Sequence, residues 1–272
     1  MSESSAFAER YGPWAIVAGA SEGVGRELAR QVAAKGVNSI LIARREGPLA
    51  ELAALIRAES GVECIPVSID LATPDAFDRI LAAVGSREVG LYISNAGADP
   101  NGSHFLDRKI ETWVEPVDRN VQTTMRSCHH FGGLMRERRR GGLLLVGSGA
   151  AFGGAPFMAV YSGAKAFDLR FGESLWAELR PFGVDVLSLV LVTTDTPALR
   201  RLLAEKHQPV PSGLASAARV AEVALARLPL GPVYSWGPLA GLRARWFRTR
   251  VRAFAALSRK VFGADRPEGR IS

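Results

Sequence analysis

The stretch from residue 14 to residue 36 restricts the fold more than any other part of the sequence. Trp14–Ala18 is a short run that is apolar throughout, the glycine-rich turn 19–25 follows it, and Arg26–Lys35 then has helical periodicity. A run of this kind predicts a strand that is buried on both faces. Glycines between a strand and a helix let the backbone approach a phosphate, and the free N–H groups at the start of the helix favour anions. We therefore interpret the turn as a phosphate site rather than as a bare turn.

The rest of the chain continues this alternation of strands and helices. Further strands are predicted at Asn38–Ala43, Val62–Ile69, Val89–Ser94, Leu143–Val146, Val184–Val190 and, at the edge, Gly231–Trp236. Helices are predicted at Glu46–Ser60, Asp75–Val84, Lys109–Arg138 (interrupted near Pro116) and Ala155–Arg180. This order predicts a single α/β domain with a doubly wound parallel sheet of about seven strands and helices on both faces.

The composition fits this prediction and limits the setting of the protein. The chain has 272 residues, of which 47% are hydrophobic, enough to build one domain with a sizeable core. It has no run of eighteen apolar residues, and its start lacks a basic region followed by an apolar core, so we expect neither a membrane span nor a signal peptide. Cys64 and Cys128 fit no metal-ligand spacing, and we expect both to be reduced packing residues. These points predict a cytoplasmic protein without a metal site.

Polar side chains follow several of the predicted strands. Arg44 and Arg45 come directly after the second strand, at the point that faces the adenosine ribose in a doubly wound sheet. An acid there would bind the 2′-hydroxyl of NAD, whereas a guanidinium matches a phosphate with paired hydrogen bonds. We therefore favour NADP(H) over NAD(H), with Arg44 as the first contact and Arg45 as the second; two solvated arginines at a helix start are the alternative. Asp70, after the third strand, is either an adenine contact or a helix cap.

A tyrosine and a lysine four residues apart suggest proton transfer. Tyr161 and Lys165 would share one face of the predicted helix, one turn apart, and Ser148 ends the preceding strand. A neighbouring ammonium favours the ionised phenol and makes the phenol a better acid at neutral pH. A hydroxyl such as Ser148 can bind the oxygen on which charge develops. The three residues can move a proton onto or off a substrate oxygen, but another group must carry the hydride.

Together these motifs are similar to those of a known family, the short-chain dehydrogenases/reductases, over roughly residues 12–236. The resemblance rests on the order and spacing of Gly19-x-x-x-Gly23-x-Gly25, Ser94-Asn-Ala-Gly97, Asn120, Ser148 and Tyr161-x-x-x-Lys165. The segments Tyr11-Gly-Pro-Trp-Ala and Leu41-Ile-Ala-Arg44 are in addition similar to the branch of 17β-hydroxysteroid dehydrogenases and long-chain 3-ketoacyl reductases.

The resemblance implies a Rossmann-type subunit that uses a nicotinamide cofactor. Tyr161 would be the catalytic acid or base, Lys165 would assist it and hold the nicotinamide ribose, Ser148 would polarise the substrate, and Asn120 would hold a proton-relay water. The cofactor would also contact Gly19, Ser21, Glu22, Gly23, Val24, Gly25, Leu71, Asn95, Ala96, Gly97, Thr194 and Thr196. As is usual in the family, the helices 109–138 and 155–180 would pair with their copies in a homodimer or homotetramer.

The chain departs from the family pattern at three places. Ala18 replaces a threonine before the first glycine, Ser94 replaces an asparagine, and Leu191-Val192 replaces the Pro-Gly that follows the sixth strand. The last change leaves the path of the nicotinamide loop open. Residues 198–214 lie where the family has its substrate lid, and their second half is polar and rich in proline, which is typical of a mobile loop.

We therefore predict an NADP(H)-dependent oxidoreductase that interconverts a ketone and a secondary alcohol. Phe152, Phe157 and Met158 either wall a pocket for a lipophilic substrate (steroid, ketoacyl or polycyclic) or pack in the core. The alternative is a catalytically silent NADP(H)-binding sensor or scaffold, which the complete set of catalytic residues disfavours.

The net charge of +7 is concentrated near the C-terminus. Arg243–Lys260 holds seven basic residues and no acid, so this one segment accounts for the net charge. The rest of the chain is near neutral, and we therefore expect no nucleic-acid-binding domain. We place a core domain at 1–240 and a basic amphipathic extension at 241–272. Leu242–Phe262 carries one apolar stripe at steps of three and four residues, which includes Leu242, Trp246, Phe247, Val251, Phe254 and Leu257. This helix either covers the pocket or a neighbouring subunit, or lies in a membrane interface, so a peripheral membrane location stays open.

Overall fold

The core of the protein is a parallel sheet of seven strands. The computed structural model describes residues 3–97, 102–191, 193–237 and 239–262. In the sheet the strands lie in the order β3-β2-β1-β4-β5-β6-β9, and every neighbouring pair is parallel. Their bounds are β1 Trp14–Ala18, β2 Asn38–Ala43, β3 Cys64–Ser68, β4 Val89–Ser94, β5 Gly141–Ser148, β6 Val184–Leu191 and β9 Val233–Ser235. The doubly wound sheet predicted from the sequence is therefore confirmed.

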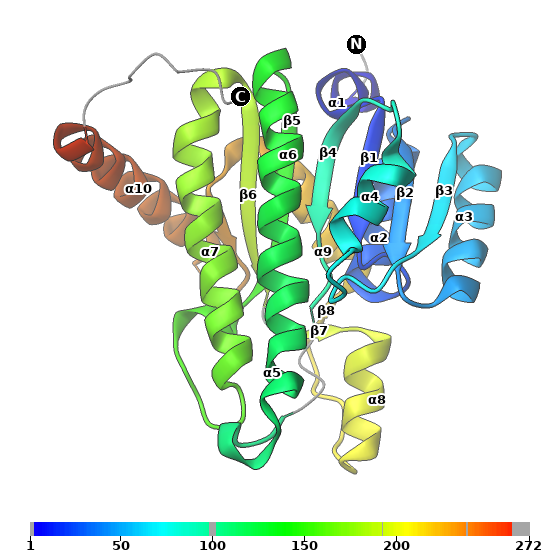
Figure 1. Ribbon diagram of the computed structural model, residues 1–272, viewed down its shortest axis with the longest axis vertical. Coiled ribbons are helices and arrows are strands. Elements are labelled where there is room, and N and C mark those ends of the chain that lie inside the picture. The colour runs from blue at the N-terminus through cyan, green and yellow to red at the C-terminus, as the bar shows by residue number, and fades with distance from the viewer. Residues whose placement is uncertain (1–2, 98–101, 192, 238, 263–272) are drawn as a thin grey trace.

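Helices cover both faces of the sheet (Figure 1). One face carries α2 (Gly23–Ala34), α3 (Glu46–Ser60) and α9 (Ala217–Arg227), and the other carries α4 (Ala76–Val84), α6 (Thr123–Arg138) and α7 (Ala159–Leu179). Successive side chains of a strand point to opposite faces, so each strand contributes to both cores. In β1, for example, Ala15 and Val17 pack under α2, whereas Ile16 and Ala18 pack under the helices of the other face.

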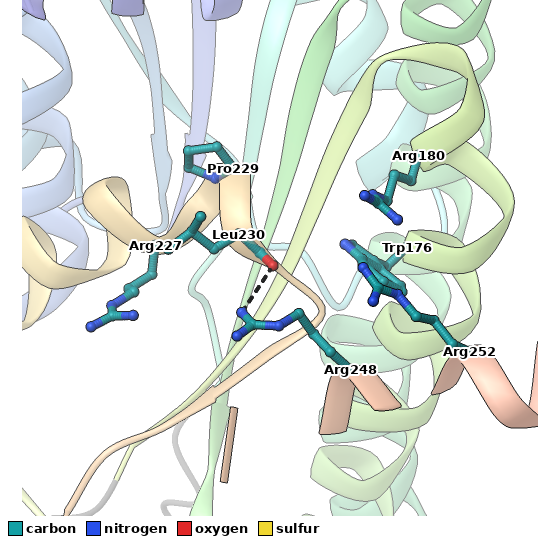
Figure 2. Close-up of a pocket in the computed structure, with 7 residues that line it drawn as sticks. All are labelled: Trp176, Arg180, Arg227, Pro229, Leu230, Arg248 and Arg252. Atoms are coloured by element: carbon teal, nitrogen blue, oxygen red, sulfur yellow. Dashed lines mark hydrogen bonds between the residues drawn. The ribbon is translucent and has the colours of Figure 1, made fainter. Parts of the chain in front are cut away.

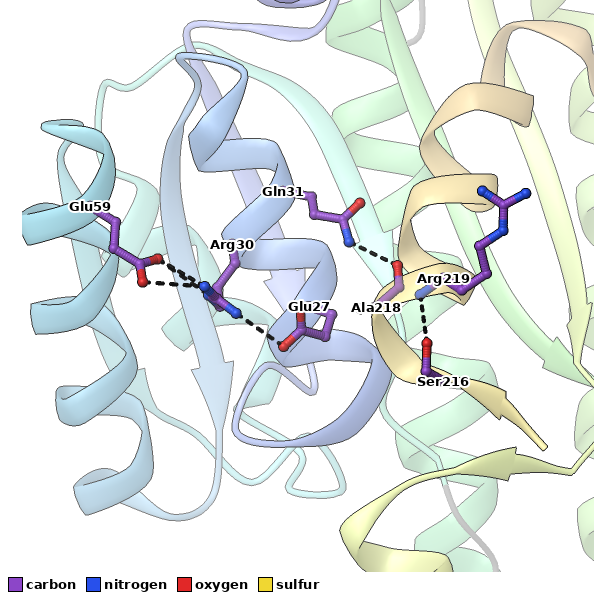
Figure 3. A network of polar contacts seen from close by, with 7 residues as sticks. All are labelled: Glu27, Arg30, Gln31, Glu59, Ser216, Ala218 and Arg219. Carbon is purple, nitrogen blue, oxygen red and sulfur yellow. Dashed lines mark hydrogen bonds and ion pairs between the residues drawn. The ribbon is translucent and has the colours of Figure 1, made fainter. Parts of the chain in front are cut away.

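Polar contacts join α2 to its neighbours on the solvent side (Figure 3). Arg30 of α2 donates to both carboxylate oxygens of Glu59 in α3, with its Nη2 atom 3.1 and 3.2 Å away. The amide nitrogen of Gln31 donates to the carbonyl oxygen of Ala218 in α9 at 2.8 Å. The helix that begins at the glycine turn is thereby fixed on both sides.

Several boundaries differ from the predictions for local reasons. The helix expected at 155–180 begins only at Ala159, because Phe157 has a positive φ of 68° that a helix does not accommodate. The helix expected at 109–138 consists of α5 (Ile110–Val117), a π-helical turn η2 (Asp118–Gln122) and α6. The interruption therefore follows Pro116 rather than coinciding with it.

Five of the described α-helices and strands were not predicted at all. An N-terminal helix, α1 (Glu3–Tyr11), docks at the amino end of β6, where Arg10 Nε and the Tyr11 hydroxyl donate to Asp185 Oδ2 at 2.5 and 2.6 Å. A second sheet pairs β7 (Thr194–Asp195) with β8 (Ala215–Ser216). Between them α8 (Pro197–Glu205) forms the first half of the segment predicted as a lid, and α9 follows β8.

The C-terminal helix α10 (Ala240–Phe262) packs on α7 and β9 through one side only. Ala244, Phe247 and Val251 are buried, whereas Leu242, Trp246, Phe254 and Leu257 are exposed. The apolar stripe predicted for this helix is therefore covered only in part: Phe247 and Val251 face the domain, and the other apolar residues lie on an adjacent, solvent-facing side. Of the described helices, none combines the length and the hydropathy that a membrane span requires.

Candidate functional site

The glycine turn after β1 is packed against the segment after β4. Gly19 has a φ of +85°, and a Cβ atom on it would lie 2.6 Å from the backbone nitrogen of Ala96. The side-chain amide of Asn95 donates to the carbonyl oxygen of Gly19 at 2.9 Å. Gly25 lies under the same carbonyl, so that a Cβ on Gly25 would overlap it. The turn keeps its shape because glycine is the residue that fits at both positions.

The start of α2 has backbone donors that its N-cap side chain does not satisfy. Glu22 is the N-cap residue of α2, and its side chain makes no capping hydrogen bond. The side chain of Val24 is buried in the core, so this residue offers only its backbone to a ligand. Free N–H groups above a tight glycine turn form an anion site. The predicted phosphate cradle is present in geometry, and its ligand remains a prediction.

One of the two predicted threonines, Thr196, lies beside this turn. The hydroxyl of Thr196 caps α8 by accepting from the backbone N–H of Leu199 at 3.2 Å. Its methyl group faces Gly23, where an added Cβ would lie 3.2 Å away. Thr194 is buried in β7, two residues earlier. Leu191-Val192 replaces the Pro-Gly of the family pattern, and Val192 lies outside the described residues.

The two arginines after β2 have different surroundings. Arg44 is 62% exposed, and its closest acid is Glu115, with Nη1 3.9 Å from Oε1. Arg45 Nη2 donates to Glu22 Oε2 at 2.7 Å and lies 3.5 Å from the hydroxyl of Ser21. Arg45 is thus engaged by a nearby acid, whereas Arg44 has only a distant one, and the order of their contacts with a cofactor stays a prediction.

One carboxylate links the glycine turn to the lid segment. Glu22 accepts from Arg45 through Oε2 and from Arg201 of α8 through Oε1, at 2.7 and 2.5 Å. Burial alone would raise the pKa of Glu22, but the hydrogen bonds and charges of the two arginines outweigh it, and the pKa lies below its usual value. Sequence reasoning placed Glu22 at the cofactor but did not detect its partner Arg201.

Asp70 and Leu71 follow β3 at the same edge of the sheet. The Asp70 carboxylate accepts from the backbone N–H of Ala72 at 3.1 Å, which shapes the turn locally. The Leu71 side chain is buried, and its carbonyl oxygen accepts from the Thr123 hydroxyl at 2.8 Å. The turn is thus fixed to α6, and its contact with an adenine stays a prediction.

The ammonium of Lys165 is buried and held by two acceptors. Lys165 is 3% exposed, and its Nζ donates to the carbonyl oxygen of Val146 in β5 and to Asp168 Oδ2, both at 3.1 Å. An ammonium has three N–H donors, so one of them is left for a further acceptor. Tyr161 lies one turn earlier in the same helix and is half-buried. α7 thus presents the pair in the arrangement predicted from the spacing.

Asp168 is a residue of this site that sequence reasoning missed. It is 4% exposed and forms a buried ion pair with Lys165, while its Oδ1 has no hydrogen-bond partner in the described part of the chain. Burial raises the pKa of the Asp168 carboxyl above its usual value, and Lys165 opposes the rise. The signal was present in the sequence, because Asp168 follows Lys165 by three residues on one helix.

Asn120 lies in the π-helical turn η2. Such turns are rare and are frequently found at functional sites. Asn120 is 1% exposed, and neither its amide nitrogen nor its amide oxygen has a partner among the described residues. A Cβ on Gly97 (φ +130°) would overlap the Asn120 side chain, so the two residues are in close contact. A buried amide without partners is suited to hold water, as predicted for the proton relay.

Ser148 ends β5, next to the other predicted catalytic residues. Its hydroxyl accepts from the backbone N–H of Ala150 at 3.2 Å, which begins the short helix η3 (Gly149–Phe152). α7 packs against β5, against η3 and against η2. These contacts bring the elements that carry Ser148, Tyr161, Lys165 and Asn120 together at the carboxyl edge of the sheet.

An aromatic pocket of about 280 Å³ lies beside this edge. Phe152, Arg243, Trp246 and Phe247 line it, and the rings of Phe152 and Phe247 stack with their centres 6.2 Å apart. Phe152 is 51% exposed and Phe157 is 48% exposed, so the interpretation of these two residues as core packing is wrong. The pocket lies between η3, which follows Ser148, and the C-terminal helix α10.

Comparison with known proteins identifies the family. The model of the short chain dehydrogenases matches residues 13–207. The chain belongs to this family. It is 35% identical over 200 residues to a very-long-chain 3-oxoacyl-CoA reductase of Laccaria bicolor, with 72% of this chain and 59% of that protein aligned. The match therefore spans about three fifths of the length of that relative.

Other short-chain dehydrogenases match over a larger share of their length. A 7β-hydroxysteroid dehydrogenase of Collinsella aerofaciens is 32% identical over 191 residues, which are 70% of this chain and 72% of that protein. A solved structure from work on 7β-hydroxysteroid dehydrogenase stereoselectivity has a TM-score of 0.80 at 26% identity, and covers 92% of this chain and 99% of that one. A short-chain dehydrogenase from Sphingobium yanoikuyae in complex with NADPH shares the fold, with a TM-score of 0.76 at 23% identity over 96% of this chain and 99% of that one.

Proposed function

We propose that this short-chain dehydrogenase interconverts a ketone and a secondary alcohol with NADP(H). The observation that carries the proposal is the Lys165 ammonium, buried and fixed by Val146 and Asp168 one helical turn after Tyr161. Proton transfer to a substrate oxygen needs a positioned acid or base, and a phenol with a buried ammonium one helical turn away can provide one.

The site residues fit a dinucleotide on three counts. The turn at Gly19 and Gly25 leaves no room for a Cβ, the start of α2 has no side-chain cap, and Asn120 has unpartnered buried polar atoms. A bound nicotinamide would supply or accept the hydride. The glycine turn and the N–H groups of α2 would bind the pyrophosphate, and the free N–H of Lys165 would bind the nicotinamide ribose.

The chain's own residues would then handle the proton. In the reduction direction the Tyr161 hydroxyl donates its proton to the substrate oxygen, and the Ser148 hydroxyl donates a hydrogen bond to the same oxygen as charge develops. The Lys165 ammonium stabilises the ionised phenol that is left. Water held at Asn120 would return a proton from solvent.

The preference for NADP(H) rests on Arg44. Its guanidinium is largely exposed after β2 and has only a distant carboxylate beside it, so it is available to a 2′-phosphate. Arg45 is already bonded to Glu22 and would contribute less.

A lipophilic substrate is supported by the aromatic pocket beside Ser148. Three of its four lining residues are aromatic, and the fourth, Arg243, has no carboxylate partner among the described residues. A steroid, acyl or polycyclic ketone would bury apolar surface there.

Cofactor turnover with a panel of bulky ketones tests the proposal. The wild-type protein should oxidise NADPH, and Tyr161→Phe should bind NADPH with unchanged affinity but lose nearly all turnover, because only the transferable proton is removed. Tyr234→Phe in β9 is the matched control and should keep full activity. NADPH binding without turnover of any ketone would instead support the silent sensor or scaffold.

A further inference from the structure

A second pocket, of about 300 Å³, lies between the ends of α7 and α9 and the middle of α10 (Figure 2). Its lining residues are four arginines and three uncharged residues: Arg180, Arg227, Arg248, Arg252, Trp176, Pro229 and Leu230. None of the lining residues is acidic. Two of these arginines belong to the basic C-terminal segment, whose charge the proposed oxidoreductase activity leaves unexplained.

The pocket is remote from the proposed active site. Trp176 follows Tyr161 by fifteen residues in the same helix, which places it about 22 Å along the helix axis. Arg180 directly follows α7, before the amino end of β6, so the pocket lies toward the amino edge of the sheet. Ser148 and Tyr161 lie at the carboxyl edge.

Three of the arginine side chains contact uncharged groups, namely an aromatic ring and a backbone carbonyl. The guanidinium carbons of Arg180 and Arg252 lie 5.2 and 5.9 Å from the centre of the Trp176 ring. Arg248 Nη1 is 3.5 Å from the carbonyl oxygen of Leu230, which accepts its hydrogen bond. Figure 2 shows these three guanidinium groups gathered around Trp176 and Leu230, with Arg227 on the opposite side of Leu230.

The guanidinium groups of this pocket lack compensating charge. No carboxylate in the described part of the chain pairs with Arg180, Arg227, Arg248 or Arg252, whereas Arg250 of the same helix pairs with Glu173. Like charges gathered without counter-charges raise the local potential and attract anions. Guanidinium forks that are already oriented match the oxygens of a phosphate and lose little entropy when they bind it.

We propose that this pocket binds a phosphate group that carries at least two negative charges. The ligand is either a soluble phosphorylated compound or the headgroup of an anionic phospholipid, because both present the same oxygens. If the ligand is a phospholipid headgroup, the apolar side chains exposed on the same helix would contact the bilayer around it. They are Leu242, Trp246, Phe254 and Leu257.

Titration of inorganic pyrophosphate into the full-length protein tests the phosphate site. The titration is done by calorimetry at low salt with saturating NADPH, so that a cofactor fills the glycine turn under the proposed function. Arg248→Gln/Arg252→Gln should weaken binding at least about tenfold, since each charge-assisted hydrogen bond contributes substantially. Arg243→Gln/Arg245→Gln is the matched control, with the same loss of charge on the same helix but outside this pocket.

The comparison of the two double variants reports on this pocket whether or not NADPH binds at the glycine turn. The test therefore remains valid even if the proposed oxidoreductase function is wrong. Wild-type protein that does not bind pyrophosphate would overturn the proposal. An equal loss in both double variants would do the same, because it would show attraction by net charge alone.

Vesicle flotation then identifies the source of the phosphate. Vesicles of phosphatidylcholine with phosphatidic acid are compared with vesicles of phosphatidylcholine alone. Flotation that needs phosphatidic acid, is displaced by pyrophosphate and is lost in Arg248→Gln/Arg252→Gln assigns the pocket to a lipid headgroup. Pyrophosphate binding without flotation assigns it to a soluble ligand. Flotation that survives in this variant would overturn the headgroup assignment.

Discussion

Lys165 Nζ lies 3.1 Å from Asp168 Oδ2, and both side chains are buried. The proposed catalytic ammonium therefore has a counter-charge one turn further along its helix. A carboxylate at this distance holds the ammonium in place and also weakens the positive field that the ammonium exerts on Tyr161. The charge of the site is set by three residues of α7 rather than by two.

Asp168→Asn should make the site more positive. The amide oxygen still accepts from Lys165, but the negative charge is gone, so the ionised phenol of Tyr161 is favoured. For alcohol oxidation, which needs the ionised phenol, the acid limb of the pH–rate profile should move to lower pH by about half to one unit. Asp185→Asn, which removes the negative charge that pairs with Arg10 at the other edge, should lower stability and leave the profile unchanged. An unshifted profile in Asp168→Asn would contradict this role.

Arg44→Ala should raise the KM for NADPH by about tenfold or more, because charge-assisted bonds to the 2′-phosphate are lost. The KM for NADH should change little. Arg45→Ala should have a smaller effect, since Arg45 is bonded to Glu22. Steady-state kinetics with both cofactors measure the difference, and equal effects on NADPH and NADH would refute the preference for NADP(H).

Gly97→Ala should destabilise the fold and disturb Asn120. The new Cβ would overlap the Asn120 side chain at a backbone conformation that favours glycine, and such overpacking costs about 1–3 kcal/mol. Chemical denaturation measures the free energy of unfolding, and kcat should fall as well. Gly47→Ala, at an open position of α3, is the control and should stabilise by about 1 kcal/mol or less. A normal kcat in Gly97→Ala would show that the position of Asn120 is not needed.

Neither cysteine should react in the folded protein near neutral pH. Burial raises the pKa of the Cys64 thiol to about 11 and raises that of Cys128 further. A raised pKa lowers the thiolate fraction, so at pH 8 only about one Cys64 side chain in a thousand is ionised. Alkylation followed by mass spectrometry should show no modification at pH 8, and modification of both residues after unfolding. Rapid labelling of the native protein would place a thiol at the surface.

The family resemblance predicts a dimer or tetramer, and α5 offers a surface for it. Ile110, Val114 and Val117 are exposed on one face of α5, within the segment expected to pair. Light scattering at micromolar concentration should give a multiple of the chain mass, and Val114→Glu should reduce it. Leu106→Glu, which changes an exposed leucine outside this helix, should not. A monomer mass for the wild-type protein would overturn the prediction.

The sequence was most informative where local pattern decides structure. The strands Trp14–Ala18, Asn38–Ala43 and Val89–Ser94 were predicted to the residue, because each is a short apolar run between turn residues. α9 was missed because it is short, and its apolar residues are too few to distinguish a helix from a loop that leads into the next strand. Which apolar residues of α10 pack was left open, because periodicity groups apolar residues by angle and does not say which of them meet the domain.

Contacts between distant segments could not be read from spacing. Arg201 reaches Glu22, and the Asn95 amide reaches the Gly19 carbonyl, only because the sheet brings these loops to one edge. Asp168 is different: its spacing from Lys165 was visible, but an acid three residues after a lysine is also common on solvated helices. The burial of both side chains distinguishes this pair from a solvated one, and burial can be seen only in the fold.

The carboxylate of Glu22 accepts from Arg45, beside the proposed cofactor site, and from Arg201, on the helix of the proposed lid, at the same time. A 2′-phosphate that drew Arg45 away would leave Glu22 with Arg201 as its partner, and a lid that swung outward would leave it with Arg45. Affinity for the cofactor and the position of the lid are then thermodynamically linked, and the coupling must be reciprocal. Such linkage would let a bound dinucleotide change how firmly α8 is held against the glycine turn.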